Sequence, residues 1–137
     1  MILIDTNVLM YSFGKDDPYR RASTQVLEAV ANEELDANID TEALQEILYV
    51  YSRRGEREWG LRVFDALLRV FAAPLPIARE DAVVARTLMG GYSRLHARDA
   101  IHAAVVLNHG LEAIISADRA FDEISEIKRL DPLELYP

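Results

Sequence analysis

Two aspartates each follow a short apolar run of the kind that forms a buried strand. Asp5 comes directly after Met1–Ile4, and Asp118 comes shortly after Ala113–Ser116. In an open parallel sheet, side chains just beyond the carboxyl ends of the strands line the ligand-binding crevice. We therefore expect the two carboxylates to lie at the same edge of a sheet.

Two further acids lie in helical patterns. Asp99 opens an apolar helical run that stops at His109, and Glu46 falls off the apolar stripe of a helix that begins near residue 41. Both are distant in sequence from the strand-end aspartates. Each of the four acids nevertheless lies at the end of an element or off an apolar stripe, so the four can converge.

Four converging carboxylates would suit Mg²⁺ or Mn²⁺, which prefer oxygen ligands and are commonly held by a few carboxylates together with phosphate oxygens of the substrate. The expected chemistry is phosphodiester cleavage, because such a metal makes bound water a nucleophile and neutralises charge on the phosphate. Without a metal, crowded carboxylates repel each other and resist ionisation. The site is therefore expected to depend on its cation.

Each acid also has a purely structural interpretation. Asp5 could be a turn or cap residue, and Asp118 could be the N-cap of a short helix over Arg119–Ile124. Asp99 could favour a helix N-terminus through the macrodipole. Glu46 could be solvated on the polar face of its helix. Composition and spacing leave both interpretations open.

The elements that would position these acids alternate along the chain. Helices are expected over residues 6–14, 19–32, 41–53, 56–73, 79–89, 99–108 and 119–124, with Gly90-Gly91 breaking the helical pattern. Strands are expected over residues 1–4, 35–39, 74–77, 113–116 and 127–130, followed by an irregular tail from Asp131. Prolines bound the strand at 74–77, which suits a sheet edge. This alternation predicts an α/β fold, a three-layer α/β/α sandwich with a mostly parallel sheet.

Two of the expected helices have clear apolar stripes, which should face the core. The helix at 41–53 carries its stripe on Leu44, Ile47, Leu48 and Tyr51. The helix at 56–73 carries its stripe on Leu61, Phe64, Leu67, Leu68 and Phe71.

Composition sets the class of protein. The 137 residues are 50% hydrophobic and fit one globular domain over residues 1–137. The absence of cysteine excludes disulfides and thiolate metal sites, and without a leader-like segment or an apolar run of membrane-spanning length we expect a cytoplasmic protein with no membrane partner. A net charge of −8 argues against broad affinity for nucleic acid, although not against a local site.

Four segments in this order resemble one known family. They are MILIDTN at the start, TEALQEILYVY from residue 41, RDAIHAA from residue 98 and SADRAFD from residue 116. Each is short, but together, at this spacing and chain length, they resemble the PIN-domain ribonucleases, and most closely the VapC toxins of type II toxin–antitoxin pairs. The resemblance covers nearly the whole chain.

The resemblance implies a PIN-like fold, a carboxylate site for Mg²⁺ or Mn²⁺, and endonucleolytic cleavage of RNA. It also implies a cognate antitoxin and a homodimer. The four family acids match Asp5, Glu46, Asp99 and Asp118 in this order, as metal ligands and catalytic residues. Asn7 and Ser116 match polar positions that orient the carboxylates or the water, and ordinary capping is the alternative role for both.

Several neighbouring residues have open roles. Glu42 lies one turn before Glu46 and could compete with it, and Asp122 could share in the site or be solvated. His102, one turn beyond Asp99, is expected to be a hydrogen-bonded structural histidine.

Four arginines could contact RNA phosphates, of which two flank the acids and two end a helix. They are Arg98, Arg119, Arg53 and Arg54. The helix-end pair could instead satisfy only terminal carbonyls.

Three functions are compatible with the residues and the resemblance. The first is a metal-dependent endoribonuclease that acts as a toxin. The second is a PIN-like module that binds RNA or protein with little catalysis. The third is a phosphoryl-transfer enzyme with Asp5 as nucleophile, but its Asp-x-Asp motif is incomplete because position 7 is Asn.

Overall fold

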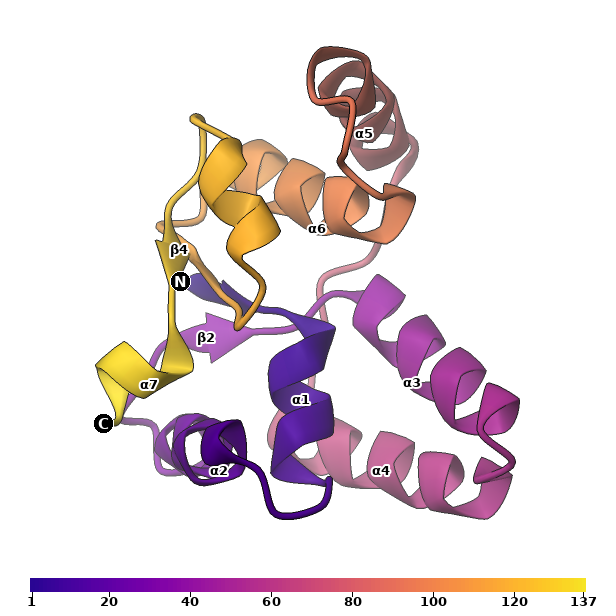
Figure 1. Ribbon diagram of the computed structural model, residues 1–137, viewed down its shortest axis with the longest axis vertical. Helices are drawn as coiled ribbons and strands as arrows, with labels where there is room; N and C mark the ends of the chain where they lie inside the picture. The colour runs from indigo at the N-terminus through magenta and orange to yellow at the C-terminus, as the bar shows by residue number, and fades with distance from the viewer.

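A computed structural model describes residues 1–137 and has one sheet of four short strands between two groups of helices (Figure 1). The strands are β1 (Ile2–Ile4), β2 (Ala37–Asn38), β3 (Ile114–Ile115) and β4 (Arg129–Leu130). Their order is β2-β1-β3-β4, and every neighbouring pair is parallel. The predicted α/β sandwich is confirmed, with a wholly parallel sheet.

The helices are divided between the two faces of the sheet. They are α1 (Thr6–Ser12), α2 (Pro18–Ala31), α3 (Thr41–Arg53), α4 (Arg57–Val70), α5 (Arg79–Gly91), α6 (Ala97–Asn108), the 3₁₀ helix η1 (Arg119–Glu123) and α7 (Pro132–Leu135). Figure 1 shows α5 and α6 on one side of the sheet and α1 to α4 on the other. None of these helices is both long and apolar enough to cross a lipid bilayer.

The inner strands connect two hydrophobic cores. Leu3 and Ile114 pack in one core with α5, α6 and η1, whereas Ile4 and Ile115 pack in the other with α1 to α4. All four side chains are fully buried. Because successive residues of a strand face opposite sides of a sheet, even these short strands can bury side chains in both cores.

The predicted strand at 74–77 is not formed. Only Leu75 pairs, through a single parallel bridge to Asp40 beyond the end of β2. Pro74 and Pro76 have no N–H group to donate, so a longer ladder of hydrogen bonds cannot form around Leu75.

Two predicted chain breaks are also wrong. Helix α5 continues through Gly90 and ends at Gly91. The predicted irregular tail contains α7, where the Asp131 side chain accepts a hydrogen bond from the N–H of Leu133 at 2.9 Å. Pro132 follows this cap at the first helical position, where a missing N–H is tolerated.

The predicted stripes of α3 and α4 match the buried faces in part. Ile47, Tyr51, Leu67 and Phe71 are buried, whereas Leu48, Leu61 and Leu68 are exposed by 37%, 47% and 40%. The buried face of α4 also includes Gly60 and Val63, which the predicted stripe left out. A methyl group built on Gly60 would lie 2.7 Å from Cβ of Tyr51 in α3, so the two helices meet where α4 has no side chain.

We expect Gly60→Ala to lower the free energy of unfolding by about 1–2 kcal/mol, because overpacking between α3 and α4 outweighs the higher helix propensity of alanine. Thermal or urea unfolding would measure the change. Gly91→Ala is the matched control: it also adds a methyl group to a helical glycine, but nothing lies within 4 Å of it, so stability should stay equal or rise. Equal stability of Gly60→Ala and wild type would contradict the packing described here.

Candidate active site

An aspartate follows each strand of the sheet and occupies the N-cap position of the next helix. Three of these aspartates use their side chains as caps: Asp40 accepts from Ala43 N–H at 3.0 Å, Asp118 from Ala120 N–H at 2.9 Å, and Asp131 from Leu133 N–H at 2.9 Å. Asp5 makes no such capping bond. Its carboxylate is therefore free for contacts with other elements.

Asp5 is tied to the end of β3 through Ser116. Asp5 is only 4% exposed, and its Oδ2 accepts a hydrogen bond from Ser116 Oγ at 2.7 Å. The same Oγ accepts hydrogen bonds from Asn7 Nδ2 at 3.1 Å and from Asp118 N–H at 3.0 Å. The polar residues predicted to orient the acids thus connect the ends of β1 and β3, and Asp5 is not merely a helix cap.

Glu46 faces the interior of the site, so the alternative of a solvated helix face is wrong for this residue. Its side chain is 13% exposed, and its Oε1 lies 3.0 Å from Nε2 of His102 on α6. The same Nε2 lies 3.6 Å from Oδ1 of Asp5. Glu46 and Asp5 therefore meet at one imidazole nitrogen, although they lie on different elements.

The other ring nitrogen of His102 contacts Asp40, an acid outside the four that were predicted for the site. Nδ1 lies 2.6 Å from Oδ2 of Asp40, and both side chains are fully buried. Thr6 Oγ1 lies 3.3 Å from Nε2. Asp40 follows a strand, as Asp5 and Asp118 do, and this position was the signal that could have identified it.

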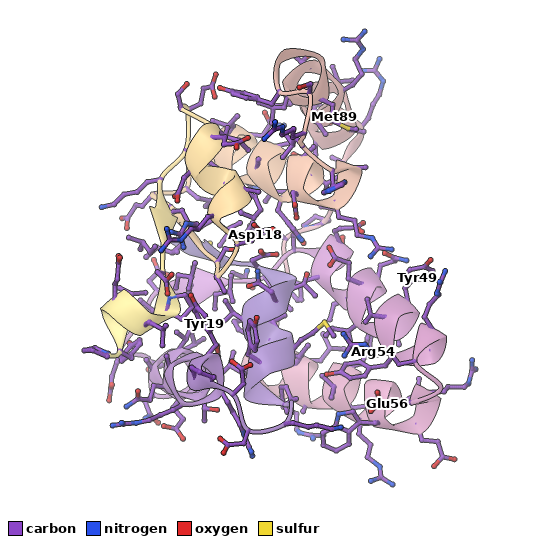
Figure 2. The ribbon with its side chains drawn as sticks, viewed as in Figure 1. Tyr19, Tyr49, Arg54, Glu56, Met89 and Asp118 are labelled. Atoms are coloured by element: carbon purple, nitrogen blue, oxygen red, sulfur yellow. The ribbon has the colours of Figure 1, made fainter.

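Asp99 and Asp118 complete the acidic cluster on its more open side. Asp99 is half-buried and its carboxylate forms no hydrogen bond or ion pair, and Asp118 is exposed. Burial, together with the negative charges of Asp5 and Asp118, raises the pKa of Asp99 to about 6. Figure 2 shows Asp118 near the centre of the molecule, between α6 and α1. The structure thus brings all four predicted acids together.

The buried groups of the cluster have opposing effects on one another. Burial raises the pKa of Asp5, and this rise is partly offset by His102 and by the Ser116 hydrogen bond. Burial alone would lower the pKa of His102, but the charge and hydrogen bond of Asp40, with smaller contributions from Glu46 and Asp5, raise it well above its usual value. His102 is therefore the basic group that faces the buried acids.

The structure also places Glu42 and Asp122, two acids whose part in the site the sequence left open. Burial and the nearby charge of Glu46 raise the pKa of Glu42, so this residue lies near the cluster without contacting His102. Asp122 instead pairs with Arg129, whose Nε and Nη2 donate to its two carboxylate oxygens at 2.8 and 3.2 Å. Asp122 is therefore engaged outside the acidic cluster.

The predicted phosphate contacts lie at different places around the cluster. The Arg98 guanidinium stacks 4.5 Å from the ring centre of Tyr49, and Arg53 donates to the Tyr49 hydroxyl at 3.1 Å. Figure 2 shows Tyr49 on the outer side of α3. Arg119 is exposed in η1, beside Asp118.

The donor chemistry fits a hydrated divalent cation. No group of three or more His, Asp or Glu side chains is placed to hold a metal ion directly. Mg²⁺, however, usually keeps several waters and is bound by one or two carboxylates. Burial contributes most to the raised pKa of Asp99, and the charges of Asp5 and Asp118 raise it further; a cation at these carboxylates would stabilise their ionised forms.

The chain is similar in sequence to known ribonucleases. The family model of the PIN domain matches residues 2–127. Ribonuclease VapC13 of Mycobacterium tuberculosis and VapC ribonuclease Mb1869c of Mycobacterium bovis are each 38% identical to the chain over 130 residues, which cover 95% of this chain and 99% of theirs.

Solved structures show the same fold. FitAcB from Neisseria gonorrhoeae has a TM-score of 0.75 at 19% identity, covering 97% of this chain and 99% of the matched chain. A toxin–antitoxin complex from Klebsiella pneumoniae has a TM-score of 0.70 at 24% identity, covering 96% and 98%.

The raised pKa of Asp99 predicts a pH-dependent stability cost in the metal-free protein. Between about pH 4 and pH 6 the unfolded chain ionises Asp99 while the folded chain keeps it protonated, so folding stability falls as pH rises. Asp99→Asn removes this cost. In chelator at pH 7.5 we expect its Tm to exceed that of wild type by roughly 3 °C, after allowance for solvent screening, and the difference should vanish near pH 4.

Thermal unfolding across this pH range would measure the difference. Asp65→Asn, at an exposed position of α4, is the control and should follow wild type at every pH. A constant gap between Asp99→Asn and wild type from pH 4 to pH 7.5 would contradict the predicted titration.

Proposed function

We propose, because this chain belongs to the PIN-domain family, that it is an endoribonuclease of the VapC type that requires Mg²⁺ or Mn²⁺. The observation that carries the proposal is the convergence of Asp5, Glu46, Asp99 and Asp118 at the carboxyl ends of β1 and β3. The reaction is hydrolysis of an RNA phosphodiester bond.

One or two of the four acids would bind the cation directly and the others would bind it through its waters, with Asp5 buried and Asp99 and Asp118 on the open side. When bound, Mg²⁺ or Mn²⁺ supplies the acidity that activates water at neutral pH and neutralises charge on the phosphate. Ser116 fixes Asp5 by donating to its Oδ2. The other oxygen, Oδ1, faces His102, which also contacts Glu46. The protein thus contributes two carboxylates, those of Asp5 and Glu46, that hydrogen bonds hold in place before the cation arrives.

RNA would have to reach these acids on a chain whose net charge is −8. We assign phosphate contacts to Arg98 and Arg119, because each directly neighbours an acid of the cluster in the sequence. Arg98 is held in place by stacking on Tyr49. Local cations of this kind offset the acidic surface only where the scissile phosphate must lie.

The proposed activity is tested by incubating the purified chain with a mixed RNA pool in Mn²⁺ or Mg²⁺ and then in chelator. We expect cleavage that needs the metal and falls at least about 100-fold in Asp99→Asn, because a ligand is lost while the fold is kept. Asp65→Asn should cleave as wild type does.

The outcomes distinguish the two main functions. Equal cleavage by wild type and Asp99→Asn would contradict the assigned site. Metal binding without any cleavage, by wild-type chain free of antitoxin, would favour the alternative of a PIN-like binding module.

We further propose a cognate antitoxin as partner, since the similar Klebsiella pneumoniae structure is a toxin–antitoxin complex. A hollow of about 660 Å³ lies between α1 and the α3–α4 turn, lined by Met10, Phe13, Gly14, Lys15, Tyr51, Arg54, Glu56 and Trp59. It adjoins a second hollow, which shares Met10 and Lys15 and reaches Asn7. Figure 2 shows Arg54 and Glu56 at the α3–α4 end.

This continuous groove is where we place the antitoxin segment, because it leads from the exposed Trp59 to Asn7 at the rim of the acidic cluster. An occupant would thereby block access of RNA to the acids.

Homodimer formation, which the resemblance implies, is a separate proposal. The apolar hollow between α5 and α6, beside the exposed Met89, is a surface available to it.

We expect Trp59→Ala to weaken binding of the proposed antitoxin by about 30-fold, because a large aromatic side chain at the end of the groove is the kind of residue that dominates binding energy. Titration of the purified partners would measure the change. Leu61→Ala is the control, since Leu61 is more exposed on the same helix but does not line the groove. Equal effects of the two variants would place the antitoxin elsewhere.

A further inference from the structure

We propose that Asp40 and His102 form a positioning pair that fixes the orientation of Glu46 in the acidic cluster. This inference rests on the proposed function, because it assigns a role toward the same cation site. Neither residue is among the four acids, and neither is assigned contact with substrate. Their role is to set where the Glu46 carboxylate points.

His102 connects elements that the sheet alone does not hold together. Its ring is fully buried on α6, with Nδ1 2.6 Å from Asp40 before α3 and Nε2 3.0 Å from Glu46 within α3. Nε2 also lies 3.3 Å from Thr6 Oγ1 at the start of α1. One imidazole therefore contacts the polar groups of three separate parts of the site.

Asp40 holds the ring in one orientation by using both of its oxygens. Oδ1 accepts the N–H of Ala43 and caps α3, and Oδ2 faces Nδ1 of His102. Since Asp40 is fully buried and immobilised by the cap, the imidazole plane is fixed relative to the first turn of α3. Glu46 lies further along the same helix, where Nε2 meets its carboxylate.

The contact with His102 is the only hydrogen bond that Glu46 makes. Without it, a flexible side chain with several rotatable bonds would have no polar restraint at the cluster. Both ring nitrogens of His102 face carboxylates, Asp40 on one side and Glu46 on the other, so the imidazole relates the position of Glu46 to that of Asp40. The arrangement resembles the outer partners that orient metal-binding side chains, whose loss typically costs about 10- to 100-fold in metal affinity.

Two substitutions of His102 distinguish the effect of the hydrogen bond to Glu46 from the effect of losing the imidazole ring. In His102→Gln the amide nitrogen can replace Nε2 and still donate to Glu46, whereas in His102→Asn it can replace only Nδ1, which faces Asp40. Both variants remove the ring and any charge it carries, so their comparison isolates the contact with Glu46. We expect Mn²⁺ to bind at least about 10-fold more weakly to the Asn variant than to the Gln variant.

Calorimetry or electron paramagnetic resonance of Mn²⁺ would give these affinities without any RNA, and circular dichroism would establish folding. In a Glu46→Gln background, His102→Asn should cause little further loss, because the residue through which it acts is already disabled. Equal Mn²⁺ affinity of the two folded His102 variants, tighter binding by the Asn variant, or effects that multiply with Glu46→Gln would overturn the proposal.

Asp40→Ser is a second probe if a His102 variant does not fold. Serine can still cap α3 but is too short to reach the imidazole, so Mn²⁺ affinity should fall several-fold. Asp81→Ser is the matched control: Asp81 of α5 is also buried, accepts from Ala78 N–H and from Asn108 Nδ2 of α6, and lies outside the cluster. Equal affinities of these two variants would overturn the proposal.

If the four acids did not form a metal site at all, the Mn²⁺ affinities would show a different pattern. Asp99→Asn would then bind Mn²⁺ as tightly as wild type, whatever the His102 variants did. That result would overturn the site and, with it, the role of the positioning pair.

Discussion

Mutual repulsion between buried carboxylates is the constraint on which the rest of this structure depends. Asp5 is 4% exposed and lies within electrostatic reach of Glu46 and Asp99, and Asp118 in turn acts on Asp99. Charges removed from water repel more strongly than exposed ones, so the protein must compensate for each of them. The imidazole of His102 supplies the nearest internal compensation, because it lies against several carboxylates at once.

The fold meets this constraint with parallel strands and helix N-termini. The strands β1 and β3 end at the same edge of the sheet, which brings Asp5 and Asp118 together. Asp5 also precedes α1, and Asp99 lies in the first turn of α6, where the positive end of the helix dipole stabilises negative charge. Two hydrophobic cores, one on each face of the sheet, hold these helices in place without using any residue of the site.

The parts of the site that follow local rules could be predicted from the sequence, and the contacts between distant elements could not. Asp5 and Asp118 were predictable because Asp5 directly follows an apolar strand and Asp118 lies shortly after another. The pair of Asp40 and His102 joins residues 62 positions apart, and locally the two look like a helix cap and a polar residue in an apolar helix. Likewise, periodicity could not show that α4 approaches α3 at Gly60, so that Gly60 and Val63 are buried while Leu61 and Leu68 are exposed.

The distribution of restraints within the cluster indicates the side on which chemistry takes place. Ser116 holds Asp5 and His102 holds Glu46, so the two inner acids are already partnered. Asp99 has no hydrogen-bond partner, and only one oxygen of Asp118 is engaged, by the cap of η1. A carboxylate left half-buried and unpartnered lowers stability, and a fold would retain it only where an external group supplies the missing charge. The unpartnered acids therefore mark the open side of the cluster as the side where cation and phosphate are expected to meet the protein.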